Sequence, residues 1–181
     1  MYGKLKVPFT LKLDGKGATL AGVLVNGDAH VPSTSASFES NRLQLTFGAD
    51  GPKLDAKLAG EELKGTFGSQ PFTAAPYCTC GMEGVAGPSI AGAWEVRESG
   101  WRLDIKRKGE DTLVMLSRAG QDIGPLNGRY DGLSFQLHYF DGTRAAVLEL
   151  EERKDGGLDV VWTEPGKEPV KAKAVRAAGV R

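Results

Sequence analysis

The sequence predicts an all-β protein of antiparallel architecture, a barrel or a sandwich, built from two similar β-meander repeats. Three observations lead to this class. Short segments that alternate apolar and polar residues recur about every 8 to 12 residues. Turn signals separate these segments, and the 25 glycines suit a chain with many tight turns. The second half of the chain also repeats segments of the first half, which indicates a duplicated β-unit.

The repeat relates residues 90–163 to residues 4–67. Residues 41–47 have their counterpart in residues 131–137, and the turn at 26–28 has its counterpart at 120–122. We expect the two repeats to share one barrel-like sheet of roughly 10 to 13 strands, because each half alone is small and would leave exposed edges. Two small sandwiches joined at residues 70–92 are the alternative.

The first strand is expected over residues 4–13, where an apolar side chain occupies every second position from Leu5 to Leu13. Residues 54–64 are interpreted as two strands around a turn rather than as a helix, because Gly60 interrupts them and their period is two. Paired turn residues predict the hairpins at Asp14-Gly15, Asn26-Gly27, Asp50-Gly51-Pro52, Asp131-Gly132, Asp141-Gly142 and Asp155-Gly156-Gly157.

Four segments are expected along the chain. Residues 1–69 form the first repeat, and residues 70–92, which are rich in proline and glycine, form a connector. Residues 93–175 form the second repeat. Residues 176–181 are basic and rich in alanine, which is typical of a linker that leads into a further module.

The composition and the apolar runs limit the kinds of partner that we expect for this chain. Lysine plus arginine equals aspartate plus glutamate at 23 each, so no net field attracts nucleic acid, and we expect no nucleic-acid partner. The apolar runs are too short for a transmembrane segment, and the start of the chain lacks the apolar core of a signal peptide.

Cys78 and Cys80 form the sharpest local feature. On an extended segment their Cα atoms would lie roughly 6.6 Å apart, at the upper limit for a disulfide, so closure needs a bent backbone. A closed ring would be strained and easily reduced, as suits dithiol exchange. No lysine, arginine or histidine lies within several residues to lower a thiol pKa, so a redox pair, a structural disulfide and free thiols all stay open.

No metal site and no cofactor is expected. Two thiolates do not complete a tetrahedral shell, and neither His30 nor His138 has the spacing of a ligand. The same scarcity of histidine argues against Ser-His-Asp or Cys-His catalysis, and no catalytic residue is assigned.

Aromatic residues concentrate in the second half. Gly92-Ala93-Trp94 resembles the Gly-x-Trp that opens the first strand of lipocalin-type barrels. An aromatic-lined ligand cavity is therefore one interpretation, and plain core packing is the other. The candidate cavity residues are Trp94, Trp101, Phe135, Tyr139 and Trp162.

Several segments together carry a family resemblance. They are similar to the β-rich N-terminal region of large bacterial TlpA-like thiol-disulfide oxidoreductases, also described as redoxin or alkyl hydroperoxide reductase/thiol-specific antioxidant proteins. The resemblance covers nearly the whole chain, in strand and turn segments rather than catalytic ones. The matching segments are 8–11, 24–28, 63–67, 88–96, 101–103, 124–132, 138–144 and 148–150.

In that family a thioredoxin-like module with a Trp-Cys-x-x-Cys motif follows the β-region and performs the redox chemistry. This chain has no such motif, and Cys78-Thr79-Cys80 does not replace it. The resemblance implies an extracytoplasmic accessory domain whose partners are the downstream module, a protein client or a second copy of the chain. A lipocalin-like carrier and an enzyme that uses Cys78 and Cys80 directly are the competing hypotheses.

Overall fold

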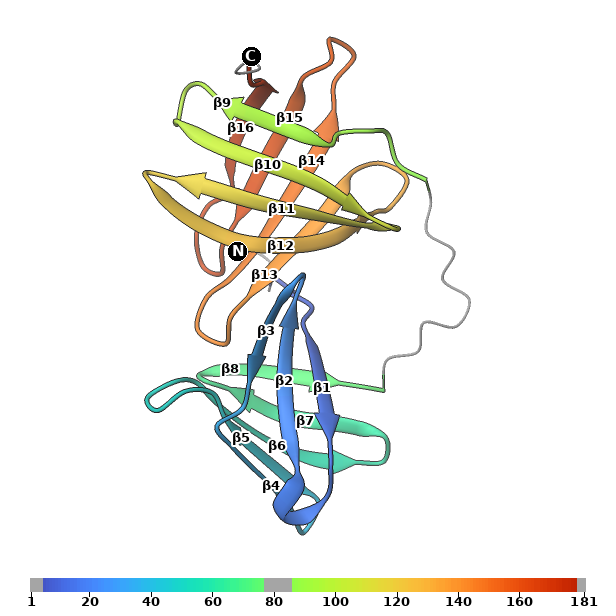
Figure 1. The fold of residues 1–181 in the computed structure, drawn as a ribbon, viewed down its shortest axis with the longest axis vertical. Helices are drawn as coiled ribbons and strands as arrows, with labels where there is room; N and C mark the ends of the chain where they lie inside the picture. Colours follow the sequence, from blue (N-terminus) through green and yellow to red (C-terminus); the bar gives the residue numbers. More distant parts are fainter. Residues whose placement is uncertain (1–4, 77–85, 179–181) are drawn as a thin grey trace. The chain divides into compact units, whose positions relative to one another are not determined.

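The computed structural model describes residues 5–76 and 86–178, and it confirms the all-β antiparallel class (Figure 1). Backbone contacts divide the chain into two compact units. Residues 9–76, with 141–144, form what we call the N-terminal unit. Residues 5–8, 86–140 and 145–178 form the barrel unit.

The N-terminal unit is a run of eight consecutive antiparallel strands in two sheets. Buried leucines and phenylalanines from both sheets form its core, and the ring centroids of Phe47 and Phe67 lie 5.3 Å apart. The three-stranded sheet contains β1 (Thr10–Asp14), β2 (Ala21–Asn26) and β3 (Ala29–Pro32), with a short 3-10 helix η1 (Gly17–Thr19) after β1. The five-stranded sheet contains β4 (Ser35–Glu39), β5 (Arg42–Thr46), β6 (Lys53–Ala59), β7 (Glu62–Phe67) and β8 (Gln70–Ala74).

The chain passes from one sheet to the other at Ser33 and Thr34. The Ser33 amide donates to the Gly22 carbonyl on β2 at 2.7 Å, whereas the Thr34 amide donates to the Thr46 carbonyl on β5 at 2.7 Å. A Cβ on Gly22 would lie 2.6 Å from Cδ1 of Leu45, so the sheets pack closely at this position. Consecutive residues therefore pair with different sheets, which splits the meander into two layers.

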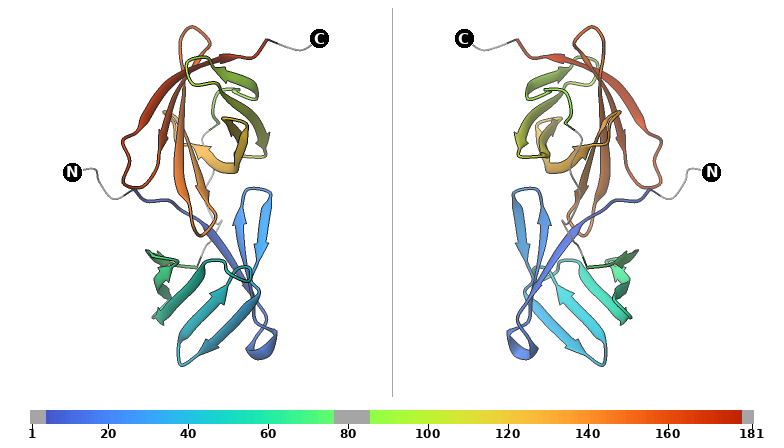
Figure 2. Two further views of the ribbon diagram at one scale, coloured as in Figure 1. Left: turned by 90° about the vertical axis from the view of Figure 1, so that its left-hand side faces the viewer. Right: turned by 90° about the vertical axis from the view of Figure 1, so that its right-hand side faces the viewer.

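The second half closes into a barrel of eight antiparallel strands (Figures 1 and 2). Closure pairs the last strand with the first, through Val175 opposite Glu95 and Arg176 opposite Trp94. The amide of Ala177 adds a bond to the Ala93 carbonyl at 2.9 Å. The strands are β9 (Gly92–Val96), β10 (Trp101–Lys108), β11 (Asp111–Arg118), β12 (Gln121–Tyr130), β13 (Phe135–Phe140), β14 (Ala145–Glu152), β15 (Leu158–Thr163) and β16 (Val170–Arg176).

Three expectations need correction. The two halves do not share one sheet, because β16 pairs with β9 and so removes the sheet edges within a single half. Residues 70–74, expected at the start of the connector, form β8 because they pair with β7 from Leu63 to Phe67. The first strand starts at Thr10 rather than at residue 4, since its partner β2 reaches only from Ala21 to Val25 in this pairing.

Candidate binding site at the barrel mouth

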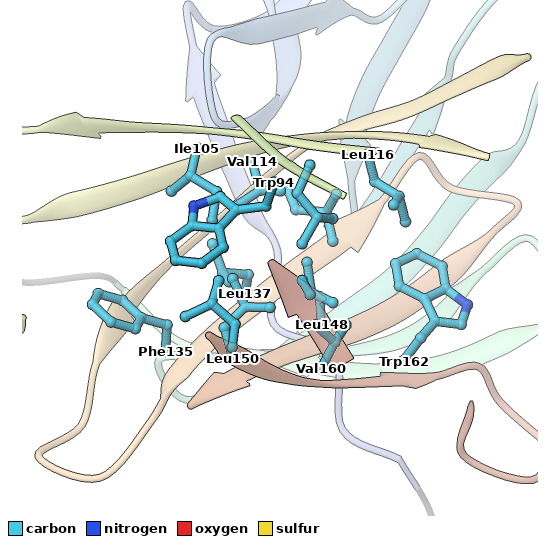
Figure 3. Close-up of a cluster of buried hydrophobic side chains, with 14 of the residues drawn as sticks. Trp94, Ile105, Val114, Leu116, Phe135, Leu137, Leu148, Leu150, Val160 and Trp162 are labelled. Carbon is cyan, nitrogen blue, oxygen red and sulfur yellow. The ribbon is translucent and has the colours of Figure 1, made fainter. Parts of the chain in front are cut away.

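The interior of the barrel is filled by side chains (Figure 3). Inward-facing positions alternate with outward-facing ones on each strand, so leucine and valine from all sides meet at the axis. The side chains of the central layers are 0% exposed, which leaves no room for a ligand among them: Leu103, Val114, Leu116, Leu126, Leu137, Leu148, Leu150 and Leu158.

The five candidate cavity aromatics do not surround one cavity, and four of them lie in pairs toward the two ends of the barrel. Trp94 and Phe135 lie toward the end that carries the β10–β11 and β12–β13 hairpins, which we call the barrel mouth (Figure 3). Trp101 and Trp162 lie at the opposite end, where their ring centroids are 6.5 Å apart in an edge-to-face arrangement. Tyr139 is partly buried on β13 and packs against the same core.

Trp94 ties the segment before β9 to the barrel. Its Nε1–H donates to the Ile90 carbonyl at 2.8 Å, and the guanidinium of Arg176 lies 4.4 Å over its ring. Arg176 also donates to the carbonyls of Ala91, at 2.7 Å, and Ser89, at 3.3 Å. The same arginine therefore holds both the indole and the segment that enters β9, at the seam where β16 closes on β9.

The opposite end contains a buried polar group, the indole N–H of Trp162. Nε1 of Trp162 has no hydrogen-bond acceptor among the described residues, although its side chain is only 3% exposed. The guanidinium of Arg118 lies over the ring of the neighbouring Trp101, 4.8 Å from the ring centroid. An unpaired buried N–H costs about 1 to 3 kcal/mol, which offsets part of the stabilisation from burial of the Trp162 ring.

A pocket of ≈ 230 Å³ opens at the barrel mouth. Its floor is apolar and comes from Ile90, Ile105 and Phe135, which are at most 5% exposed. Its remaining side chains include two cations and one carboxylate. They belong to the segment before β9 and to the strand ends around the mouth: Ala86, Gly87, Pro88, Ser89, Ala91, Lys106, Arg107, Glu110, Thr112 and Tyr130.

The wall of this pocket is closely packed. The rings of Tyr130 and Phe135 lie directly opposite each other on β12 and β13, with centroids 4.9 Å apart. Gly87 approaches them so closely that a Cβ would lie 2.7 Å from Cγ of Tyr130, which only glycine avoids. Asp131 stabilises the turn that connects β12 to β13, because its Oδ1 accepts hydrogen bonds from the amides of Leu133 and Ser134, both at 2.9 Å. These amides hold the pKa of Asp131 below its usual range.

Sequence reasoning did not identify this pocket, although it identified Phe135. Alternation on β10 could have indicated it, because Arg107 is the next inward-facing position after Leu103 and Ile105. Cys78 and Cys80 lie outside the described residues. Within residues 5–76 and 86–178, no group of three or more histidine, cysteine, aspartate or glutamate side chains is placed to hold a metal ion.

His138 gives the barrel a pH-dependent stability. Burial lowers the pKa of its imidazole below 6.5, and a hydrogen bond to the Asn127 backbone acts in the opposite direction. As the pH falls through about 6.5, the unfolded chain takes up the proton before the folded chain does, so the free energy of unfolding decreases. We expect the urea midpoint of the barrel to fall between pH 7.5 and 5.5, and His138→Gln to reduce this fall. An unchanged slope in the variant would contradict the assignment.

The N-terminal unit carries a second, shallower hollow of ≈ 300 Å³ on its five-stranded sheet, lined mostly by serine, threonine and charged residues. Beside it, Arg42 binds Asp55 through two bonds, Nε to Oδ1 at 2.7 Å and Nη2 to Oδ2 at 2.5 Å. This pairing, reinforced by Gln44, lowers the pKa of Asp55. Two buried leucines, Leu45 and Leu54, also line this hollow, but no aromatic side chain does, whereas Tyr130 and Phe135 line the barrel mouth. We therefore take the mouth as the stronger candidate site.

Fold and site together define a two-unit antiparallel β-protein with a side-chain-filled barrel and a pocket at the barrel mouth. Comparisons with protein-family models, with curated proteins and with solved structures each gave no match. None of the helices in the described part of the chain has the length and apolar character needed to cross a membrane.

Proposed function

We propose that this chain is a non-catalytic accessory domain of an extracytoplasmic thiol-disulfide oxidoreductase. In this role it binds a client, positions a downstream thioredoxin-like module or forms a dimer surface. The strand and turn segments that resemble TlpA-like proteins support the proposal. The observation that carries it is the filled barrel, because a rigid scaffold without internal space acts through its ends and its outer surface.

The reading frame of the gene tests the proposed parent. We expect the sequence beyond the codon for Arg181 to encode a thioredoxin-like segment with Trp-Cys-x-x-Cys. A frame that continues into an unrelated domain, or that stops there, would count against an oxidoreductase parent.

The reduction of insulin disulfides by dithiothreitol tests the non-catalytic role. We expect the 181-residue chain and its Cys78→Ser/Cys80→Ser variant to give the same rate as dithiothreitol alone, because no lysine, arginine or histidine lies within several residues of the two thiols in sequence to activate them. A rate that rises with the native chain and is lost in the double variant would make the chain itself an oxidoreductase.

The second candidate function is a small-ligand binding protein. The pocket at the barrel mouth favours it, since apolar floors with a few polar groups at the rim are typical of ligand sites. In this candidate the ligand binds at the mouth, above the filled interior, and not inside the barrel as in a lipocalin.

A further inference from the structure

The last inward-facing layer of the barrel differs from the layers beneath it. On β10 the inward series runs Leu103, Ile105, Arg107, and Arg107 lies directly opposite Thr112 on β11. Thr112 is one of the few buried polar residues, at 5% exposure. The inward positions at the mouth thus carry the exposed Arg107 and the buried Thr112, where the deeper layers carry aliphatic side chains.

Arg107 is available for a ligand. Its Nε donates to the Gly109 carbonyl at 3.1 Å, which anchors the side chain at the β10–β11 turn. Among the described residues, no carboxylate lies within ion-pair distance of its guanidinium. Glu110, the one carboxylate of the pocket, lies 3.6 Å from Arg129, a cation that it shares with Asp111 at 2.7 Å.

The other cation of the pocket, Lys106, is directed elsewhere. Alternation places its side chain on the outer face of β10, and its Nζ lies 3.5 Å from Asp104 on that face. Arg107 is therefore the cation that stands above the apolar floor of Ile90, Ile105 and Phe135.

We propose that the barrel mouth binds a small apolar monocarboxylate, with its carboxylate on Arg107 and its hydrocarbon body on Ile90, Ile105 and Phe135. The inference rests on the small-ligand candidate function and is independent of the oxidoreductase parent. A volume of ≈ 230 Å³ corresponds to roughly eight water volumes, which suits a ligand of about eight non-hydrogen atoms. A guanidinium pairs with a carboxylate through two parallel hydrogen bonds, which gives the acid an advantage over neutral analogues.

The probe is 4-methylpentanoate, compared with 4-methylpentanamide, which has the same shape without the charge. Titration of the ¹⁵N-labelled chain resolves three indole N–H signals, one for each tryptophan. We expect the Trp94 signal to shift, because this N–H bonds to Ile90 in the pocket floor, and the Trp162 signal at the opposite end to stay. The expected dissociation constant is on the order of 1 mM for a ligand of this size.

Two variants localise the charge. Arg107→Gln should weaken binding of the acid about ten-fold or more and leave the amide unchanged. Arg102→Gln removes a positive charge from the exposed face of the same strand and should change neither. Unchanged thermal unfolding of both variants would show that the barrel is intact.

The outcomes separate the two claims. If acid and amide bind equally well, or if Arg107→Gln binds the acid like the native chain, the carboxylate assignment is overturned while the small-ligand function stands. If neither probe shifts the Trp94 signal at 20 mM, about twenty times the expected constant, both are overturned.

Discussion

Replacing Leu148 by alanine is expected to destabilise the barrel by about 3 to 5 kcal/mol. Leu148 is 0% exposed and lies between Leu137 on β13 and Trp162 on β15. Its removal leaves a cavity that a closed barrel cannot collapse, because hydrogen bonds on both sides fix the strands. Urea unfolding followed by tryptophan fluorescence measures the effect, since all three tryptophans of the chain lie in the barrel strands.

The matched control is Leu133→Ala. Leu133 is 82% exposed at the tip of the β12–β13 hairpin, so the same chemical change there should alter the free energy of unfolding by less than about 0.5 kcal/mol. A loss below about 1 kcal/mol for Leu148→Ala would mean that the interior already contains space. Such a result would favour the lipocalin-like carrier over a filled scaffold.

Local chemistry explains why the hairpins could be predicted. Aspartate followed by glycine appears at three turns of the barrel half, and in each the aspartate Oδ1 accepts backbone amides of the same turn. Because both partners of each bond lie in the same turn, the local sequence is enough to predict these turns. The segment around Gly60 is predictable for the same reason, since its φ of 65° suits a glycine turn between β6 and β7.

Closure of the sheets depends on distant residues and was not predicted. The pairing of Arg176 with Trp94 joins positions about 80 residues apart, and nothing in either segment specifies the other. The expected correspondence of residues 41–47 with 131–137 is only partial, because β5 spans Arg42–Thr46 whereas β13 begins at Phe135. Leu43 is buried in β5, and its counterpart Leu133 is 82% exposed in a turn. The counterpart turns at 26–28 and 120–122 fall after the second and third strands, so the similarity of these segments did not fix the register of the repeat.

Of the residues that form the candidate site, only Phe135 was identified from the sequence. An aromatic-lined cavity and plain core packing were the two interpretations of the aromatic residues, and alternation places these residues on the inward face, where they pack into the core. Whether an inward face encloses a void depends on how side chains from eight strands fill the axis, which no single segment reveals. Arg107 was not predicted as a site residue, because a charged residue near the end of an apolar strand is ordinarily exposed to solvent.

The two end tryptophans should respond differently to replacement by phenylalanine. Trp94→Phe removes the donor to the Ile90 carbonyl and leaves that buried acceptor unpaired, in addition to the lost ring volume. Trp162→Phe also loses ring volume, yet it removes an N–H that has no acceptor among the described residues. We therefore expect Trp94→Phe to cost about 1 to 3 kcal/mol more than Trp162→Phe.

Differential scanning calorimetry measures this pair without relying on the fluorophores that are changed. The comparison is well matched, because both side chains are at most 3% exposed and both lie in strands of the same barrel. Trp94→Phe should also free the segment at residues 89–91, which would increase hydrogen exchange there although Arg176 still donates to the carbonyls of Ser89 and Ala91. Equal losses for the two variants would mean that Trp162 has an acceptor in solution, and the end of the barrel opposite the mouth would then hold an ordered water or ligand atom.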